Sequence, residues 1–483
     1  MKSLNKCISF SQQPEELAQL TSTRYWEIYP LTDTDSLLLH LLTGAIDILN
    51  KSEVHLVQQM FKSGKTSSLP DEIKDILIKR GYLSNLKSEQ IFIDNLAECH
   101  QQQVKEKPIE FFICPTFSCP VGCSYCFEGN LTHESKTAVI NSQQIDSIFS
   151  SVKKIAEDSG HPVKEIVLFG GEPLLPITRL AVREILQHSA EQEFKVSVCT
   201  SGIFSSEFVS LFHEFSDTVS VVRITIDGPK KYHDTLRTLP NAFEKTAKGI
   251  DDLLKDGIPV MTRTNVGSHN LETIPKMAEY FVERGWANHD HFDAIITGIK
   301  DRGCAGDKGY LLREDELAVR FLEMRATHEA VRRLRPVNIF MSLKHLATNL
   351  GHLGGIIKPQ SAVTPLDTIK FHGCGATDGT LFVFGADNEV YTCTEAIGKL
   401  SMSVGKYHPE LALIQSRVNN WRGWYKYKIL KCRECKYLLI CGDTCTMSSV
   451  AQFGSGDKPI CPPIQHIIGG YISALAKRIE LIS

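Results

Sequence analysis

Apolar and polar residues follow two different spacings along this chain, and each change of spacing marks a new segment. Near the start, short β-prone runs are bounded by turn-prone residues such as Gly44, and they lie at 24–29, 36–41 and 46–49. Helical spacing then takes over in three stretches that begin near Ser52, Pro70 and Ser88. The pattern predicts strands followed by helices, a small α+β module over residues 1–107.

From residue 110 onward, candidate strands and helices alternate. The strand-like runs lie at 110–114, 165–169, 194–200, 219–226, 260–266 and 291–297. Amphipathic helical patterns separate them, most clearly at 145–155, at 243–255 and after Asn270, which reads first as a helix N-cap. This alternation predicts a parallel sheet covered by helices, and six such strands suggest a partial barrel with its chemistry at the carboxyl ends of the strands.

The remaining third of the chain has weaker periodicity. Residues 301–372 form a bridging region that predicts one long helix between 314 and 333, with Arg332 and Arg333 on a solvated face. A hairpin is expected at 381–392, where Asp387-Asn388 supplies the turn, and an apolar helix at 464–482 ends the chain.

Composition narrows the class of protein. The net charge of −3 and the hydrophobic content of 42% do not favour nucleic acid or an acidic membrane surface as a partner. The sequence shows neither a cleavable signal nor an apolar run of about 18 residues, so we expect a soluble, cytoplasmic protein. Fifteen cysteines in a reducing compartment favour metal ligation by thiolates over disulfides.

The first cysteine group follows the strand-like run at 110–114. Cys119, Cys123 and Cys126 are spaced to hold three corners of an iron–sulfur cube and to leave one iron open. A zinc knuckle or a group of core cysteines is the alternative. The spacing, followed by Phe127, resembles the signature of radical S-adenosylmethionine (radical SAM) enzymes, in which the open iron binds the amino and carboxylate groups of SAM.

Polar motifs stand where the next three predicted strands end. Gly170-Gly171-Glu172-Pro173 resembles the family motif that holds the SAM amino group, and the two glycines would let the backbone approach a ligand. Thr200-Ser201 is similar to the family's Thr-Asn, with Ser201 a departure. Thr225, Asp227 and Arg237 resemble the stretch that meets the SAM ribose or carboxylate. The resemblance therefore implies that these residues, with Phe127, bind the cofactor.

Seven further cysteines follow in the last quarter of the chain. Their order and gaps resemble the SPASM domain, which carries two auxiliary iron–sulfur clusters in peptide-modifying radical SAM enzymes; a zinc ribbon is the alternative. The resemblance implies that Cys374, Cys393 and Cys445 hold an inner cluster. It assigns the outer cluster to Cys432, Cys435, Cys441 and Cys461.

The resemblance leaves the inner cluster without an evident fourth cysteine. Thr368 and His372 occupy the region that some relatives use, and Cys304 is the best remaining thiol. An open iron that binds substrate is the other possibility.

Together these patterns predict an α/β chain built on a (β/α)6 partial TIM barrel, the radical SAM core, with a winged-helix-like module before it and an iron–sulfur domain after it. The expected boundaries are 1–107, 108–300, 301–372, 373–465 and 466–483. The first module resembles the element that recognises the leader of a precursor peptide, which adds as a strand to its sheet edge. Covering the barrel or dimerisation is the alternative role.

The resemblance implies an enzyme with SAM and three 4Fe–4S clusters, and with a low-potential electron donor such as flavodoxin or ferredoxin. We expect it to crosslink a ribosomally made precursor peptide, through a thioether or a carbon–carbon or ether cyclophane. The first alternative is a sulfatase-maturating enzyme that makes formylglycine. A non-catalytic iron–sulfur electron carrier or a zinc-binding interaction protein is the more distant one. The sequence does not identify the peptide, the bond, a catalytic acid or base, or the oligomeric state.

Overall fold

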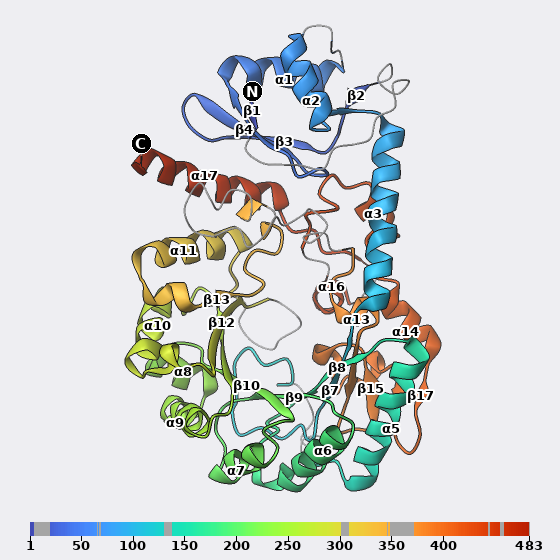
Figure 1. The fold of residues 1–483 in the computed structure, drawn as a ribbon, viewed down its shortest axis with the longest axis vertical. Helices are drawn as coiled ribbons and strands as arrows, with labels where there is room; N and C mark the ends of the chain where they lie inside the picture. Colours follow the sequence, from blue (N-terminus) through green and yellow to red (C-terminus); the bar gives the residue numbers. More distant parts are fainter. Residues whose placement is uncertain are drawn as a thin grey trace.

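The computed structural model of the chain places an N-terminal module above a partial barrel, with helix α17 between them (Figure 1). It describes residues 1–3, 20–64, 66, 69–129, 138–300, 309–344, 346–347, 371–442, 445–454 and 458–482. No helix of this described part is long and apolar enough to cross a membrane.

The N-terminal module is an antiparallel sheet followed by helices. Its strands, in the spatial order β1-β5-β4-β3, are β1 (Lys2–Ser3), β5 (Ile46–Asn50), β4 (Asp35–His40) and β3 (Trp26–Pro30). The helices are α1 (Lys51–Ser63), α2 (Asp71–Lys79) and α3 (Leu86–Glu106), and a small pair, β2 (Thr21–Ser22) with β6 (Leu83–Ser84), was not predicted. Asn50 starts α1 by accepting a hydrogen bond from the Glu53 N–H, and Gly64 ends it at a φ of 68°.

The two faces of this sheet bury different surfaces, because successive strand residues point to opposite sides. Leu38 and Leu49 pack with Val57 of α1 in a small core of the module itself. Leu37 and Leu39, on the other face, belong to the large core that also contains Ile468 of α17 (Ile464–Ile482). The module is therefore packed onto the rest of the chain through a buried apolar face.

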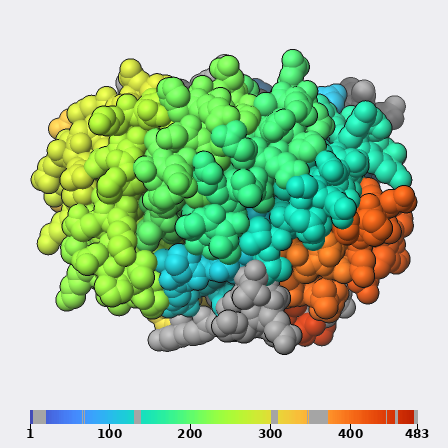
Figure 2. Space-filling model, turned by 90° about the horizontal axis from the view of Figure 1, so that it is seen from below, coloured from blue at the N-terminus to red at the C-terminus, as the bar shows by residue number. Residues whose placement is uncertain are grey.

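The barrel follows the predicted alternation of strands and helices. Its parallel strands are β7 (Ile109–Ile113), β8 (Val163–Leu168), β9 (Val196–Thr200), β10 (Val219–Thr225), β11 (Val260–Val266) and β12 (Phe292–Gly298). The helices are α5 (Ser142–Ser159), α6 (Arg179–Glu191), α7 (Ser206–Glu214), α8 (Lys230–Arg237), α9 (Ala242–Lys255) and α10 (Ile274–Glu283). Seen from below, the green segments, which include α6 to α9, cover most of this face (Figure 2).

The predicted hairpin does not stand apart from the barrel. β14 (Leu381–Phe384) pairs in parallel with β7, so that β14, β15 (Glu389–Tyr391), β16 (Gly405–Lys406) and β17 (Ala412–Leu413) extend the barrel sheet. β13 (Arg335–Pro336) extends the other end beside β12. Asn388 takes a φ of 67° in the β14–β15 turn, as its place in the predicted turn requires.

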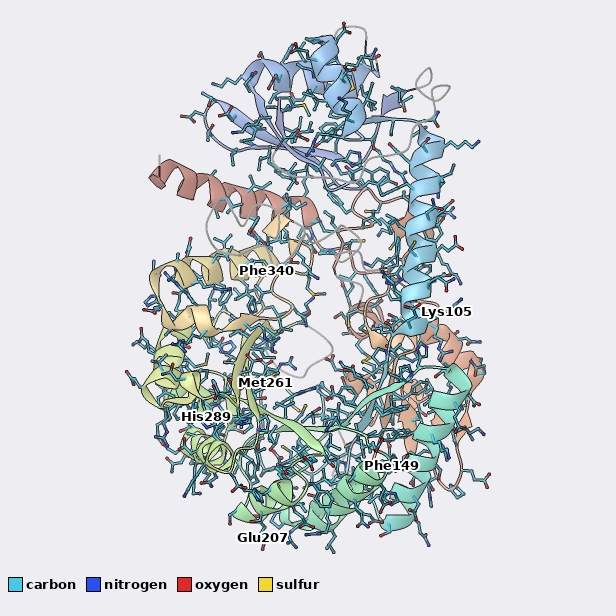
Figure 3. All side chains as sticks on the ribbon, in the orientation of Figure 1. Lys105, Phe149, Glu207, Met261, His289 and Phe340 are labelled. Atoms are coloured by element: carbon cyan, nitrogen blue, oxygen red, sulfur yellow. The ribbon has the colours of Figure 1, made fainter. Side chains whose placement is uncertain are left out.

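Short helices complete the C-terminal part. They are α13 (Gly375–Asp378), α14 (Gln415–Arg422), α15 (Leu430–Arg433) and α16 (Thr446–Phe453). Long helix α3 runs down one side to this part and to the barrel, where Lys105 marks its lower end (Figure 3). Tyr425 donates a hydrogen bond of 3.0 Å to the Ala97 carbonyl of α3, which fastens the helix there.

The predicted helix over 314–333 is too long. α11 (Glu314–Thr327) stops where His328 adopts an extended backbone, and a separate 3-10 turn follows at Ala330–Arg333. Arg332 and Arg333 are exposed, as predicted, but their guanidinium groups donate to backbone carbonyls of Arg325 and Ala287. These hydrogen bonds hold the 3-10 turn against the end of α11 and against the segment around Ala287.

Candidate active site and metal centres

The first cysteine group lies on one loop after the end of β7. Burial raises the pKa of the Cys119 thiol to about 12, and the neighbouring Cys123 and Cys126 thiols contribute to that rise. The three sulfurs therefore lie close enough to influence one another electrostatically. This proximity fits three ligands of one iron–sulfur cluster.

Helix α8 holds this loop through its last turn. The Gly122 and Ser124 N–H groups donate to the Arg237 and Leu236 carbonyls over 3.2 and 3.4 Å. The Arg237 side chain also turns toward the loop, and its Nη1 lies 3.4 Å from the Cys123 sulfur. Backbone and side chain of the same helix end thus position the cysteine loop.

Asp227, just beyond β10, is the centre of a buried network. Its Oδ2 lies 3.1 Å from Arg237 Nη2 and accepts a short hydrogen bond from the Tyr125 hydroxyl of the cysteine loop. Its Oδ1 accepts from the Asn265 N–H at 3.3 Å. Burial alone would lower the pKa of Arg237, but Tyr125, Asp227 and Cys123 together raise it above its ordinary value. The guanidinium therefore stays charged beside Cys123.

Sequence reasoning did not identify Tyr125 and Asn265. Asn270 stands at the predicted N-cap position, before the 3-10 turn Leu271–Thr273, but its side chain makes no capping hydrogen bond. Its amide donates instead to the Asp227 and Asn265 carbonyls at 2.8 and 2.9 Å. It is 1% exposed and ties the ends of β10 and β11 together. The aromatic position inside the cysteine motif was the one available signal for Tyr125.

Close packing inside the protein leaves no room for a side chain at either glycine of the 170–173 motif. A Cβ on Gly170, which has a φ of 90°, would lie 2.1 Å from the Cys114 sulfur. A Cβ on Gly171 would lie 2.2 Å from the Ser118 carbonyl oxygen. The motif therefore packs directly against the segment that enters the cysteine loop, in addition to the predicted approach to a ligand.

The Glu172 carboxylate is buried and joins two strand ends. It accepts hydrogen bonds from the Thr200 hydroxyl at 2.6 Å, the Ser201 hydroxyl at 2.6 Å and the Ser201 N–H at 2.8 Å. Burial raises the pKa of Glu172, and these hydrogen bonds oppose the rise. Ser201, which stands where the family motif has Asn, thus joins the end of β9 to the segment that follows β8.

The remaining predicted cofactor residues lie around the same edge. Thr225 ends β10 and is half-buried, Pro173 is buried beside Glu172, and Phe127 is half-buried against the large core. Several nitrogens here are buried and have no hydrogen-bond partner in the described part of the chain: Arg237 Nε, His233 Nε2 and both ring nitrogens of His269. Such groups fit a polar ligand, as SAM would be, at the ends of β10 and β11.

The inner group of C-terminal cysteines shares a local geometry. Cys374, Cys393 and Cys445 are the residues that precede α13, the 3-10 turn Thr394–Ala396 and α16. Burial raises the pKa of Cys374 and of Cys393, and Cys445 adds to both rises. Three thiols at the amino ends of helical turns fit an anionic group, because exposed N–H groups there favour negative charge.

The outer group comes together in the same way. Burial raises the pKa of Cys432 to about 11, with further contributions from Cys441, Cys461 and Cys435, while Lys426 lowers it. These four thiols therefore lie close enough to influence one another electrostatically. Among the residues described, no three His, Cys, Asp or Glu side chains are arranged to hold a single metal ion.

The His372 ring stacks on Tyr425 and His100, with centroid separations of 4.7 and 5.5 Å. Since His100 belongs to α3, this stacking is part of the interface with that helix. Thr368 and Cys304, the other candidates for a fourth ligand, lie outside the described residues.

Comparisons with known proteins find a matching family profile and similar sequences. Residues 113–281 match the sequence profile of the Radical SAM superfamily. The chain is 26% identical over 360 residues to the AdoMet-dependent heme synthase of Methanosarcina barkeri (strain Fusaro / DSM 804). That alignment covers 72% of this chain and 94% of the heme synthase. It is 25% identical over 179 residues to the sporulation killing factor maturation protein SkfB of Bacillus subtilis (strain 168), covering 37% and 40% of the two chains.

A solved structure has a similar fold over nearly the whole chain. The crystal structure of Streptococcus suis SuiB bound to precursor peptide SuiA superposes with a TM-score of 0.53 at 14% identity. The superposition covers 91% of this chain and 98% of SuiB. At that identity the likeness establishes a shared fold.

Proposed function

Residues 113–281 form a radical SAM domain, and from this premise we propose that the chain modifies a ribosomally made precursor peptide by an oxidative crosslink, a thioether or a carbon–carbon or ether cyclophane. The fold shared with SuiB supports this proposal through its extent. The superposition covers 91% of this chain, so at least part of the N-terminal module, residues 1–107, is matched in SuiB as well.

The proposed cofactors are SAM and three 4Fe–4S clusters, held by the cysteine groups described above. When bound, the cluster on Cys119, Cys123 and Cys126 would supply the electron that cleaves SAM, and the auxiliary clusters would accept the electron released as the substrate closes its new bond. Residues of the chain position these groups. Arg237 and Tyr125 hold the cysteine loop to Asp227, and Glu172 closes the adjoining strand ends. Flavodoxin or ferredoxin is the proposed electron donor.

We assign leader recognition to residues 1–107. The β3 side of the sheet faces the C-terminal part, where Glu27 pairs with Lys436 at 2.6 Å and Tyr29 donates to the Gln465 carbonyl. At the opposite edge, β5 pairs with Lys2 and Ser3 of β1 among the described residues. A leader that docked at this edge would add a further strand to the sheet.

The test is co-expression with a short precursor encoded in a neighbouring reading frame, followed by mass spectrometry of the peptide. One crosslink should remove two hydrogen atoms. A matched variant with Cys119, Cys123 and Cys126 changed to Ala should leave the peptide unmodified. Deletion of residues 1–84 uncovers the face on which Leu37 and Leu39 pack against the large core, so reductive SAM cleavage by the truncated chain is measured first. A truncated chain that retains this cleavage should modify the precursor more weakly than the parent.

Cluster content supplies a separate measurement. Anaerobic reconstitution should load about twelve iron and twelve sulfide per chain, and about eight of each in the triple-Ala variant. Stoichiometric zinc without charge-transfer absorbance would contradict the proposal.

The heme synthase relatives support a second candidate, SAM-dependent modification of a tetrapyrrole. The best of these alignments spans 94% of the relative but only 72% of this chain. A tetrapyrrole enzyme has no evident use for a peptide-docking sheet. Turnover of a tetrapyrrole carboxylate by the loaded enzyme, without modification of any precursor, would favour this second candidate.

A further inference from the structure

Lys426 is a buried lysine in the C-terminal part, between α14 and α15. Only 2% of its surface is exposed. Its backbone N–H donates to the Phe371 carbonyl at 2.9 Å, and the preceding Tyr425 forms an isolated β-bridge with His372. Lys426 begins a turn over residues 426–428, and these contacts hold its backbone in place.

The contacts of three neighbouring side chains show how this turn is placed. Tyr425 and Tyr427 both reach α3, where they donate to the Ala97 carbonyl and to Asp94. The Lys426 ammonium group donates a short hydrogen bond to the Cys441 carbonyl.

This ammonium lies beside the backbone of Cys441, one of the ligands proposed for the outer cluster. Four thiolates around an iron–sulfur core carry negative charge, and each added electron increases that charge. A fixed cation at this distance favours the reduced form.

We infer that Lys426 is a positioning residue that holds the reduction potential of the outer auxiliary cluster more positive than the thiol ligands alone would set it. The inference rests on the proposed function, which places a 4Fe–4S cluster on Cys432, Cys435, Cys441 and Cys461. It gives the outer cluster a specific place in the reaction, as the readier electron acceptor.

Substitutions of Lys426 separate its charge from its hydrogen bond. Lys426→Met removes both, Lys426→Gln keeps an N–H donor without the charge, and Lys426→Arg keeps the charge. Lys428→Met is the matched control, because Lys428 is exposed two residues away. All four are placed in the Cys119→Ala, Cys123→Ala, Cys126→Ala chain, so that only the auxiliary clusters contribute to the spectra.

The measurement is a redox titration followed by electron paramagnetic resonance, with iron counted in each sample. We expect Lys426→Met and Lys426→Gln to move one of the two midpoints to a more negative potential and to leave the other in place. Lys426→Arg and Lys428→Met should reproduce the parent.

Two results would overturn the inference. One is an unshifted midpoint in Lys426→Gln with full iron content, which would show that Lys426 acts only through its hydrogen bond to the Cys441 carbonyl. The other is an equal shift of both midpoints, which would show no preference for the outer cluster. Failure of the proposed cluster assignment is distinguishable from both, since the parent chain itself would then hold no auxiliary cluster. Failure of the proposed crosslinking is a separate result, an unmodified precursor with the parent chain.

Discussion

The guanidinium of Arg237 contacts the thiol of Cys123, with Nη1 3.4 Å from the sulfur. The same guanidinium reaches the Asp227 carboxylate, and only 6% of Arg237 is exposed. Position and charge of the cysteine loop are therefore set together by one residue of α8. Solvent cannot substitute for these contacts, because the network is buried.

Arg237→Lys should therefore impair the site although it keeps the positive charge. A lysine has no planar fork and cannot contact Cys123 and Asp227 together. We expect reductive SAM cleavage by the loaded enzyme to fall about 10- to 100-fold, which corresponds to the loss of a charge-assisted hydrogen bond of about 1.5–3 kcal/mol. Arg223→Lys is the control, since Arg223 pairs with Glu165 at 2.9 Å away from this network. Equal rates in both variants would remove Arg237 from the machinery.

Gly171→Ala should displace the segment that carries the cysteines. The added Cβ would lie 2.2 Å from the Ser118 oxygen and 2.6 Å from the Phe117 carbonyl carbon, both backbone atoms that cannot swing aside. We expect a loss of about four iron atoms per chain on reconstitution. Gly257→Ala, where no atom lies within 4 Å of the new Cβ, should keep its iron and cost about 1 kcal/mol through its φ of 73°. Full iron loading of Gly171→Ala would contradict this reading.

Hydrophobic spacing predicted the barrel strands to within two residues at each end. Buried parallel strands are nearly continuous apolar runs, and the helices between them carry a clear apolar stripe, so both have local signals. The parallel pairing of β14 with β7 had none, because the two strands lie far apart in the sequence. Strand pairing of that kind depends on the assembled fold.

The site was predictable in type but not in its hydrogen bonding. Cysteine spacing marked the thiol groups, and the strand-end motifs marked the edge where Glu172, Thr200 and Asp227 meet. No local pattern distinguishes an asparagine that caps a helix from Asn270, which joins two strand ends. Likewise no local pattern marks Lys426 as buried, because its ammonium group contacts the carbonyl of Cys441, which the assembled fold brings next to it.

Ser201→Ala should destabilise the chain through Glu172. It removes the 2.6 Å hydrogen bond from the Ser201 hydroxyl and leaves a buried carboxylate oxygen with one donor fewer. The expected cost is about 1–3 kcal/mol, measured as a lower midpoint in anaerobic thermal unfolding. Ser201→Asn should recover part of it, because its amide can donate to the same oxygen. Ser210→Ala, at an exposed helical position, should change stability by less than about 0.5 kcal/mol.

The last prediction concerns His40 and the stability of the N-terminal module below neutral pH. His40 is 1% exposed; its Nε2 lies 2.9 Å from the Gly81 carbonyl, while Nδ1 accepts from the Leu42 and Thr43 N–H groups. Burial lowers the pKa of His40 to about 3. A proton added to Nδ1 would face two donors, so the folded module requires the neutral ring.

The direction of the pH effect follows from these two states. The unfolded chain takes up the proton near the ordinary histidine pKa of about 6.5, whereas the folded chain does not until about 3. Stability is therefore complete above about pH 6.5 and decreases as the pH falls toward 3. From pH 7.5 to pH 5.5 the module should lose about 1.4 kcal/mol, measured by hydrogen exchange of the β4 amides. His40→Gln should lack this loss, and His55→Gln, at an exposed position of α1, should retain it. If His40→Gln lost the same stability as the parent over this range, another group would have to carry the pH dependence.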